Sequence, residues 1–260
     1  MRPLVWLTEE LDTEVLILAE LGASPRRFLS KLNKLASVPY HWTFSINTRV
    51  HLFTRAPSDF FVAIRETPYI SIRHIRLPAQ PEFLLTMVHL PSQMFVDSPS
   101  RFGEISELAT EIAEAEKSVG HKRTLVVGDF NVSPFEPALV SATGLHAVMT
   151  STIAEKGSRT IRGRSYSFFY NPMWNLMGKE SPGPPGSYFY RRSDHVSYFW
   201  NTFDQVLLRP DLLPYFDRKS LRFISEIGDS SLLTEAGVPN STEYSDHLPL
   251  VFDLRLQLGD

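Results

Sequence analysis

The sequence has no cysteine among its 260 residues. That absence excludes disulfide bonds, metal sites built from thiolates, and enzymes with a cysteine nucleophile. It does not fix the cellular compartment. The chain also lacks an internal repeat, a low-complexity tract and a clean linker. We therefore expect residues 1–260 to form a single domain with a sizeable core.

Long apolar runs are missing as well. No stretch of about 18 apolar residues is present to span a membrane, and the N-terminus does not resemble a signal peptide. We therefore expect a cytoplasmic protein. Positive charge is not in excess either, because the net charge is −3. Strong non-specific binding of nucleic acid is thus not implied, although a local basic patch is not excluded.

The sequence does contain apolar runs that end in polar residues. The clearest is Leu125–Val127, which passes through Gly128 to Asp129 and Asn131. This run predicts a buried strand, with both polar side chains on one side of its carboxyl end. Open α/β sheets usually present ligands there, and a carboxylate beside a carboxamide suits a hard cation and a neighbouring phosphate or water. The alternative is an ordinary turn, since Gly, Asp and Asn are common turn residues.

Other strands repeat this placement. A buried carboxylate is costly unless it meets a cation or a donor, and converging carboxylates raise one another's pKa unless a divalent ion is present. Without cysteine, such a set favours Mg²⁺ or Mn²⁺ over zinc. The further residues are Glu20 at the end of residues 14–20, His89 at the end of residues 82–89, Asp204 within residues 200–208, and Asp246 with His247 before the last strand.

Periodicity indicates the remaining elements. Residues 100–117 carry an apolar stripe with glutamates outside it, which predicts a helix with a solvated face and implies no protein partner. Residues 25–35 are also typical of a helix. Residues 14–20 and 82–89 predict buried strands, whereas residues 70–77 alternate and predict a half-exposed antiparallel region.

Residues 150–200 are too long and irregular for a simple connection. They are rich in arginine and aromatic residues, which suit phosphate tracking and base stacking, and equally suit a solvated loop with a small aromatic core. We interpret Ser193-Asp194-His195 as a loop element. The candidate substrate-binding residues are Arg159, Arg162, Arg164 and Trp174.

Five segments, in chain order, resemble motifs of the endonuclease/exonuclease/phosphatase superfamily. That superfamily includes deoxyribonucleases, abasic endonucleases, deadenylases, inositol-phosphate phosphatases and bacterial sphingomyelinases. Each short match is weak evidence alone, whereas five matches in the order of the family are strong evidence. The segments are Leu16-Ile17-Leu18-Ala19-Glu20, Val88-His89-Leu90, Gly128-Asp129-Phe130-Asn131, Phe203-Asp204-Gln205-Val206-Leu207 and Ser245-Asp246-His247-Leu248-Pro249.

The resemblance implies a role for each residue. Glu20 would bind Mg²⁺, with Mn²⁺ as a substitute, and Asp129 and Asp246 would also approach the metal. Asp129 would activate or orient the attacking water, and Asn131 would position that water or the phosphate. His89 would contact the phosphate or assist the leaving group, and Asp204 would support the site. Asp246 would alternatively pair with His247. His247 would stabilise the pentacovalent phosphorus.

One departure concerns the N-terminal region. The superfamily's first strand usually supplies an Asn, but none of the 19 residues before Glu20 is Asn. Either the natural chain starts upstream or the strand is absent, and one sheet is then expected to expose an edge.

The resemblance implies a four-layer α/β sandwich of two packed mixed β-sheets flanked by helices. The expected function is Mg²⁺-dependent hydrolysis of a phosphodiester in nucleic acid. One alternative is a phosphatase or phosphodiesterase that acts on a small molecule or lipid head group. The other is a catalytically impaired binding or regulatory protein.

Overall fold

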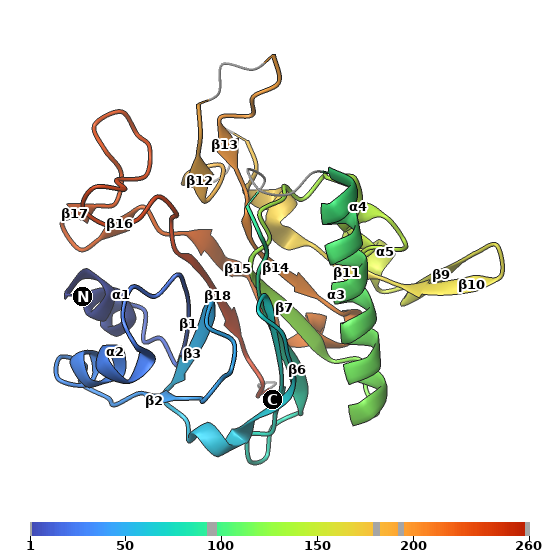
Figure 1. Cartoon of the computed structure of the whole chain (residues 1–260), viewed down its shortest axis with the longest axis horizontal. Coiled ribbons are helices and arrows are strands. Elements are labelled where there is room, and N and C mark those ends of the chain that lie inside the picture. The colour runs from blue at the N-terminus through green and yellow to red at the C-terminus, as the bar shows by residue number, and fades with distance from the viewer. Residues whose placement is uncertain (1, 93–97, 179–182, 192–194, 258–260) are drawn as a thin grey trace.

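The computed structural model describes residues 2–92, 98–178, 183–191 and 195–257. Its centre is a seven-stranded sheet in the order β4-β5-β6-β7-β14-β11-β8 (Figure 1). The sheet is mixed, because β6–β7 and β8–β11 are parallel and the other neighbours are antiparallel. Its strands are β4 Phe61–Glu66, β5 Ile70–Ile75, β6 Phe83–His89, β7 Thr124–Asp129, β8 Ala147–Val148, β11 Phe169–Tyr170 and β14 Asp204–Leu208.

The other elements surround this sheet. The helices are α1 Arg2–Glu10, α2 Pro25–Leu32, α3 Ser98–Val119, α4 Pro137–Val140 and α5 Ser151–Ala154, with 3₁₀ helices η1 Ser58–Phe60, η2 Pro172–Leu176 and η3 Pro210–Tyr215. The outer strands are β1 Val15–Ala19, β2 His41–Trp42, β3 Val50–Thr54, β9 Ser158–Ile161, β10 Arg164–Ser167, β12 Tyr188–Phe189, β13 Trp200–Asn201, β15 Phe216–Phe223, β16 Glu226–Ile227, β17 Ser230–Ser231 and β18 Leu250–Leu254. None of the described helices combines the length and the apolar character needed to cross a bilayer.

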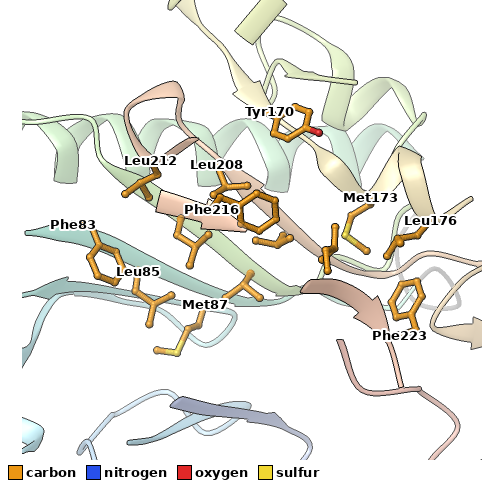
Figure 2. Packing of buried hydrophobic residues seen from close by; sticks show 14 of the residues in the cluster. Phe83, Leu85, Met87, Tyr170, Met173, Leu176, Leu208, Leu212, Phe216 and Phe223 are labelled. Atoms are coloured by element: carbon orange, nitrogen blue, oxygen red, sulfur yellow. The ribbon is translucent and has the colours of Figure 1, made fainter. Parts of the chain in front are cut away.

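Strand β6 is buried on both faces of the central sheet. Phe83, Leu85 and Met87 pack into one core with Phe216 and other residues of the outer strands, as Figure 2 shows. Leu84, from the same strand, packs on the other side under α3. A strand covered on both faces reads as a continuous apolar run, so the prediction for residues 82–89 is confirmed.

Helix α3 covers the second face. Ile105, Leu108 and Ile112 are fully buried against this face, which includes Leu84 and Val126. The helix predicted for residues 100–117 is therefore confirmed and extends beyond both ends. The helix predicted for residues 25–35 is shorter, because α2 begins after the N-cap Ser24 and ends at Leu32.

The second β layer is not one continuous sheet. It consists of a three-stranded antiparallel piece, β1-β3-β2, and a two-stranded piece, β15-β18. Both pack on the central sheet, through Val50 and Leu52 of β3 and through Phe216 and Phe223 of β15. The predicted central mixed sheet is thus found, whereas the predicted second mixed sheet is divided into two separate pieces.

A cleft separates these two pieces. It has a volume of about 2020 Å³, and its lining includes residues 14–20 along β1 and 248–257 along β18. Among the described residues, no strand pairs with the edge of β1 or of β18 that borders the cleft. The exposed edge expected from the sequence is therefore present.

Two burial predictions are wrong, and the cleft explains the first. Only Leu16 is buried in β1, because this strand is an edge beside solvent. Strand β5 was expected to be half exposed, yet five of its six residues are buried. Strands β4 and β6 pair with its two edges, and α3 packs on one face. Its polar Arg73 is buried and forms an ion pair with Glu66 at 2.7 Å.

Candidate active site

The register of the central sheet brings three predicted site residues side by side. His89 pairs with Asp129 across the parallel strands β6 and β7, and Asp204 pairs with Asp129 across β7 and β14. Neighbouring strands lie about 4.8 Å apart. Met87 and Val127, two residues earlier on their strands, belong to the core on the cleft side. Because side chains alternate between faces, His89 and Asp129 point to that same side.

Gly128 makes the close approach of β6 and β7 possible. Its φ is +139°, and a Cβ at this position would lie 2.0 Å from the Val88 carbonyl oxygen. Any side chain would therefore force the two strands apart immediately before Asp129. The next bend is made by Asn131, whose φ is +51°, a conformation that Asn tolerates better than most residues.

Asn131 fixes the Asp129 carboxyl group from two directions. Its backbone N–H donates to Asp129 Oδ1 at 2.8 Å, and its side-chain Nδ2 donates to Oδ2 at 2.9 Å. Arg101 in turn donates to the carbonyl of Asn131 at 2.9 Å. Burial and the charge of Asp204 raise the pKa of Asp129 to about 7, against the opposing effect of His247.

His247 forms an ion pair with Asp204. Its Nδ1 lies 2.7 Å from Asp204 Oδ2. Burial lowers the pKa of His247, but the charge and hydrogen bond of Asp204, with the charges of Asp129 and Asp246, outweigh burial and raise it to about 9. His247 is therefore a cation at neutral pH. Asp246 is exposed and lines the cleft. The sequence suggested Asp246 as a partner of His247, but in the structure Asp204 is the residue that pairs with His247.

His89 lies between two carboxylates. Its Nε2 is 3.5 Å from Glu20 Oε1 and 3.8 Å from Asp129 Oδ2, which is too long for direct hydrogen bonds. Burial lowers the pKa of His89, so its ring is neutral at pH 7. Glu20 follows β1 with φ +51°, and its side chain is 79% exposed.

The cleft offers oxygen ligands of the kind that a hard divalent cation prefers, but among the described residues no three His, Asp or Glu side chains of the cleft bring their ligand atoms within 4.8 Å of one another. Glu20 and Asp129 lie on either side of His89, and Asp246 lines the same cleft. The crowding of Asp129 by Asp204 is an excess of negative charge that such an ion would relieve. Carboxylate oxygens with water in the remaining positions match the preferences of Mg²⁺ and Mn²⁺.

Arg49 is a site residue that the sequence reasoning missed. It lines the cleft, its guanidinium lies 4.8 Å from the centre of the Tyr69 ring, and its carbonyl accepts a hydrogen bond from the N–H of Glu20 at 3.1 Å. No motif surrounds it. The available signal was strand pairing, because Ala19 pairs with Val50 and thereby brings Arg49 beside Glu20.

Tyrosine side chains border the histidine end of the cleft. The Tyr188 ring lies 4.8 Å from the His247 ring and stacks on Tyr190 at 6.3 Å. Tyr190 and Tyr198 also line the cleft and are 39% and 61% exposed. These exposed aromatic faces are suitable for stacking against a planar ligand.

The predicted arginine contacts are placed elsewhere. Arg159, Arg162 and Arg164 belong to the β9–β10 hairpin, which extends away from the central sheet (Figure 1). None of them is among the described residues that line the cleft. The structure therefore places these arginines apart from the cleft, and their predicted role in tracking the phosphates of a substrate stays a prediction.

Trp174 has an indirect connection to the cleft. Its ring lies 6.3 Å from Phe135, which contacts Tyr198 at 5.1 Å. Its predicted role in substrate binding stays a prediction. Of the Ser-Asp-His triplet interpreted as a loop element, residues 193 and 194 lie outside the described residues, and His195 lines the cleft.

Comparison by sequence finds no matching protein-family model and no matching curated protein. Solved structures do match across nearly the whole chain. TDP2 of D. rerio, solved in complex with a single strand DNA product, gives a TM-score of 0.56 at 17% identity and covers 95% of this chain and 88% of its own. ANGEL2, described as a 2′,3′-cyclic phosphatase, gives 0.55 at 17% identity, with 99% and 86% covered.

A third match carries the name of the superfamily. It is an endonuclease/exonuclease/phosphatase family protein from Bacteroides thetaiotaomicron, with a TM-score of 0.51 at 13% identity, covering 98% of this chain and 89% of its own. The resemblance seen in the five sequence motifs is thus confirmed at the level of the fold. At these identities the likeness extends to the fold alone.

Proposed function

We propose that this protein is a metal-dependent hydrolase that cleaves phosphodiester bonds, with nucleic acid as its substrate. The contact that carries the proposal is the 2.7 Å ion pair between His247 and Asp204, which holds a cation beside Asp129. Without a metal the pKa of Asp129 is about 7, and a bound divalent ion would lower it, which leaves the carboxylate ionised and able to accept a proton. A fixed cation next to it is suited to the charge of a phosphoryl group.

The roles follow from these contacts. Asp129 accepts the proton of the attacking water, and the two hydrogen bonds from Asn131 hold its carboxyl group in a single orientation. His247 donates to an anionic phosphate oxygen through the nitrogen that does not face Asp204. Mg²⁺ held by Glu20 and Asp129 would supply Lewis-acid polarisation of a phosphate oxygen. Arg49 adds a second positive charge at the Glu20 side of the cleft.

The aromatic border supports a nucleic-acid substrate. Tyr188, Tyr190 and Tyr198 line the cleft, and base stacking on aromatic rings contributes about 1–3 kcal/mol per base in other proteins. TDP2 of D. rerio has the same fold and was solved with a single strand DNA product, which supports the choice of nucleic acid as the substrate.

A second candidate is a phosphodiesterase or phosphatase that acts on a small molecule. Arg49 and Arg255 are the two Lys or Arg side chains among the described residues of the cleft lining. Proteins that track a polynucleotide backbone usually use more positive charge. The description of ANGEL2 as a 2′,3′-cyclic phosphatase also favours a small phosphate ester as the alternative. A third candidate, a binding protein without turnover, retains affinity for such ligands but releases no product.

One set of reactions separates these candidates. The protein is incubated with labelled single-stranded DNA, RNA, plasmid, and a 2′,3′-cyclic nucleotide, each with Mg²⁺, Mn²⁺ or EDTA. We expect cleavage of a nucleic acid that needs the metal. Cleavage of the cyclic nucleotide alone supports the second candidate, and activity that persists in EDTA contradicts the metal-dependent proposal.

Variants assign the activity to the site. Asp129→Asn and His247→Ala are expected to lower the rate by at least about 100-fold, the scale of losing one key transition-state contact. His41→Ala is the matched control, because His41 is exposed on β2 and is not among the described cleft residues. An unchanged rate in Asp129→Asn means that the catalytic assignment is wrong.

Two arginine variants test the length of the substrate. Arg49→Ala is expected to weaken cleavage of every substrate, because Arg49 lies in the cleft. Arg162→Ala on the β9–β10 hairpin is expected to affect only long nucleic acids that reach the hairpin. A loss with a cyclic nucleotide in Arg162→Ala would contradict the hairpin's placement away from the reacting phosphate.

A further inference from the structure

A second group of metal-ligating side chains lies apart from the cleft. His74, Glu82 and His121 each offer one ligand atom, and these atoms all lie within 4.8 Å of one another. His74 Nε2 is 3.1 Å from Glu82 Oε2, and the two imidazole rings are 5.6 Å apart. None of the three is among the described residues that line the cleft.

The register of the sheet explains why these residues meet. His74 of β5 pairs with Leu84 of β6, and Glu82 precedes Leu84 by two residues. The side chains of these three residues therefore point to the same face of the sheet. Leu84 packs under α3, which identifies that face. His121 lies in the connection between α3 and β7, and Arg123 in the same connection accepts a backbone hydrogen bond from Leu84 at 2.7 Å.

The group lies at the end of the sheet opposite the candidate active site. Leu84 and His89 are five residues apart on β6, which corresponds to about 17 Å along a strand. Ligands at the two ends of β6 are therefore independent of each other.

Two buried nitrogen atoms in this group lack a conventional partner. Among the described residues, neither His74 Nε2 nor His121 Nε2 makes a hydrogen bond of acceptable geometry. The His74 side chain is only 13% exposed, so water does not readily satisfy it. Buried polar atoms are nearly always paired in folded proteins, and an ion held between the imidazoles and Glu82 would satisfy both nitrogens at once.

We propose that His74, Glu82 and His121 form a binding site for a transition-metal ion of the Zn²⁺ class. Two imidazole nitrogens and one carboxylate oxygen are a ligand set that favours Zn²⁺ over Mg²⁺, with water in the fourth position. The ion joins the end of β5, the start of β6 and the α3–β7 connection. Its role is therefore to stabilise this end of the central sheet.

Two local features weaken the binding of a metal ion at this site. The backbone N–H of Arg123 contacts His121 Nδ1 at 3.3 Å, and binding through Nε2 gives up that contact because Nδ1 then carries the proton. The positive charge of Arg123 also acts on His121, although its Nε is engaged by the carbonyl of Glu82 at 2.5 Å. We therefore expect weaker binding than at a four-ligand structural zinc site.

The test uses metal-free protein and Co²⁺ as a spectroscopic substitute for Zn²⁺. The visible absorption of Co²⁺ reports a low-coordinate site with nitrogen ligands, and Zn²⁺ is then added as a competitor. Glu82→Gln keeps the shape of a half-exposed side chain and removes one ligand. We expect at least about tenfold weaker binding in Glu82→Gln and in His121→Ala.

Two control variants separate this site from others. Glu20→Gln removes a ligand of the candidate active site, and His41→Ala removes an exposed histidine, so in both the Co²⁺ absorption that arises from nitrogen ligands is expected to match the wild type. Loss of the Co²⁺ signal in Glu20→Gln with full binding in Glu82→Gln would place the ion in the cleft and overturn the proposal. Unchanged affinity in both cluster variants would overturn it as well.

A stability measurement keeps the result decisive if His121→Ala does not fold. Zn²⁺ is expected to raise the thermal midpoint of the wild type and of Glu20→Gln, but not that of Glu82→Gln. Equal Zn²⁺-induced shifts in the wild type and Glu82→Gln would contradict the site. The Mg²⁺-dependent hydrolysis rate of Glu82→Gln provides a separate readout, so failure of this site is distinguishable from failure of the proposed function.

Discussion

Replacing Asp204 by Asn tests the central ion pair of the candidate active site. The change keeps a hydrogen-bond acceptor beside His247 Nδ1 and removes the negative charge. Burial lowers the pKa of His247, and the charge of Asp204 is the main effect that raises it to about 9. The pKa of His247 is therefore expected to fall toward or below its ordinary value of 6.5 in metal-free Asp204→Asn.

The magnitude follows from the size of that shift. A fall from about 9 to 6.5 corresponds to about 3 kcal/mol, an upper value because the His247 side chain is 27% exposed and keeps its hydrogen bond. A raised histidine pKa contributes stability that is fully present below pH 6.5 and is lost as pH rises through 9. Asp204→Asn should therefore be destabilised most near pH 6, and progressively less between pH 6.5 and 9.

Two measurements check this prediction. The imidazole proton signals of His247 are followed by NMR against pH in EDTA, which gives the pKa without any need for turnover. Urea unfolding at pH 6, 7.5 and 9.5 gives the free energy of unfolding of the wild type and the variant. His89→Ala and His195→Ala identify which imidazole signals arise from the other two histidines that line the cleft.

Either of two results would refute the reasoning. A wild-type His247 that titrates near 6.5 would show that Asp204 does not hold its charge. A destabilisation of Asp204→Asn that is the same at all three pH values would show that the loss comes from packing and not from the ion pair.

Three other predictions concern residues of β7 and of helix α3. Because burial raises the pKa of Asp129 to about 7, its ionised form destabilises the metal-free protein above that pH. Asp129→Asn should thus be more stable at pH 8, by up to about 4 kcal/mol in urea unfolding, with the gain shrinking as pH falls from 7 to 4. Gly128→Ala should lose the folded structure in circular dichroism, because its Cβ would lie 2.0 Å from a carbonyl oxygen, whereas Gly22→Ala, with nothing nearby, should not. Glu116→Gln should cost about 3–5 kcal/mol in thermal unfolding, because it leaves the buried Arg209 without its charged partner at 2.7 Å.

The parts of the fold predicted from sequence are those whose apolar pattern is clear within the element itself. Strands β6 and β7 and helix α3 were located closely because their apolar patterns are complete over their whole length. The ends of β6 and β7 then placed His89 and Asp129 in adjacent positions. The sequence pattern could predict this because both residues lie at the ends of strands whose buried residues form a clear apolar run.

The parts that failed depend on partners distant in sequence. The burial of β1 was overestimated because an apolar run does not show that its strand is an edge. The alternation within β5 was taken for exposure, although Arg73 is buried with an ion-pair partner. Arg49 was missed because its place depends on the pairing of β1 with β3. The sequence also did not show in which direction the β9–β10 hairpin extends.

The cleft between β1 and β18 has a consequence for hydrogen exchange. Each strand is bonded on one side, to β3 or to β15, and in the described chain its other side meets the cleft. Successive N–H groups of a strand point in opposite directions. Every second amide is therefore protected by the partner strand, and the amides between them face the cleft. Deuterium uptake should therefore follow a period of two along Val15–Ala19 and Leu250–Leu254, and be slow throughout Phe83–His89, which is bonded on both sides. Any chain segment that enters the cleft and pairs with both edges would reveal itself by abolishing that alternation.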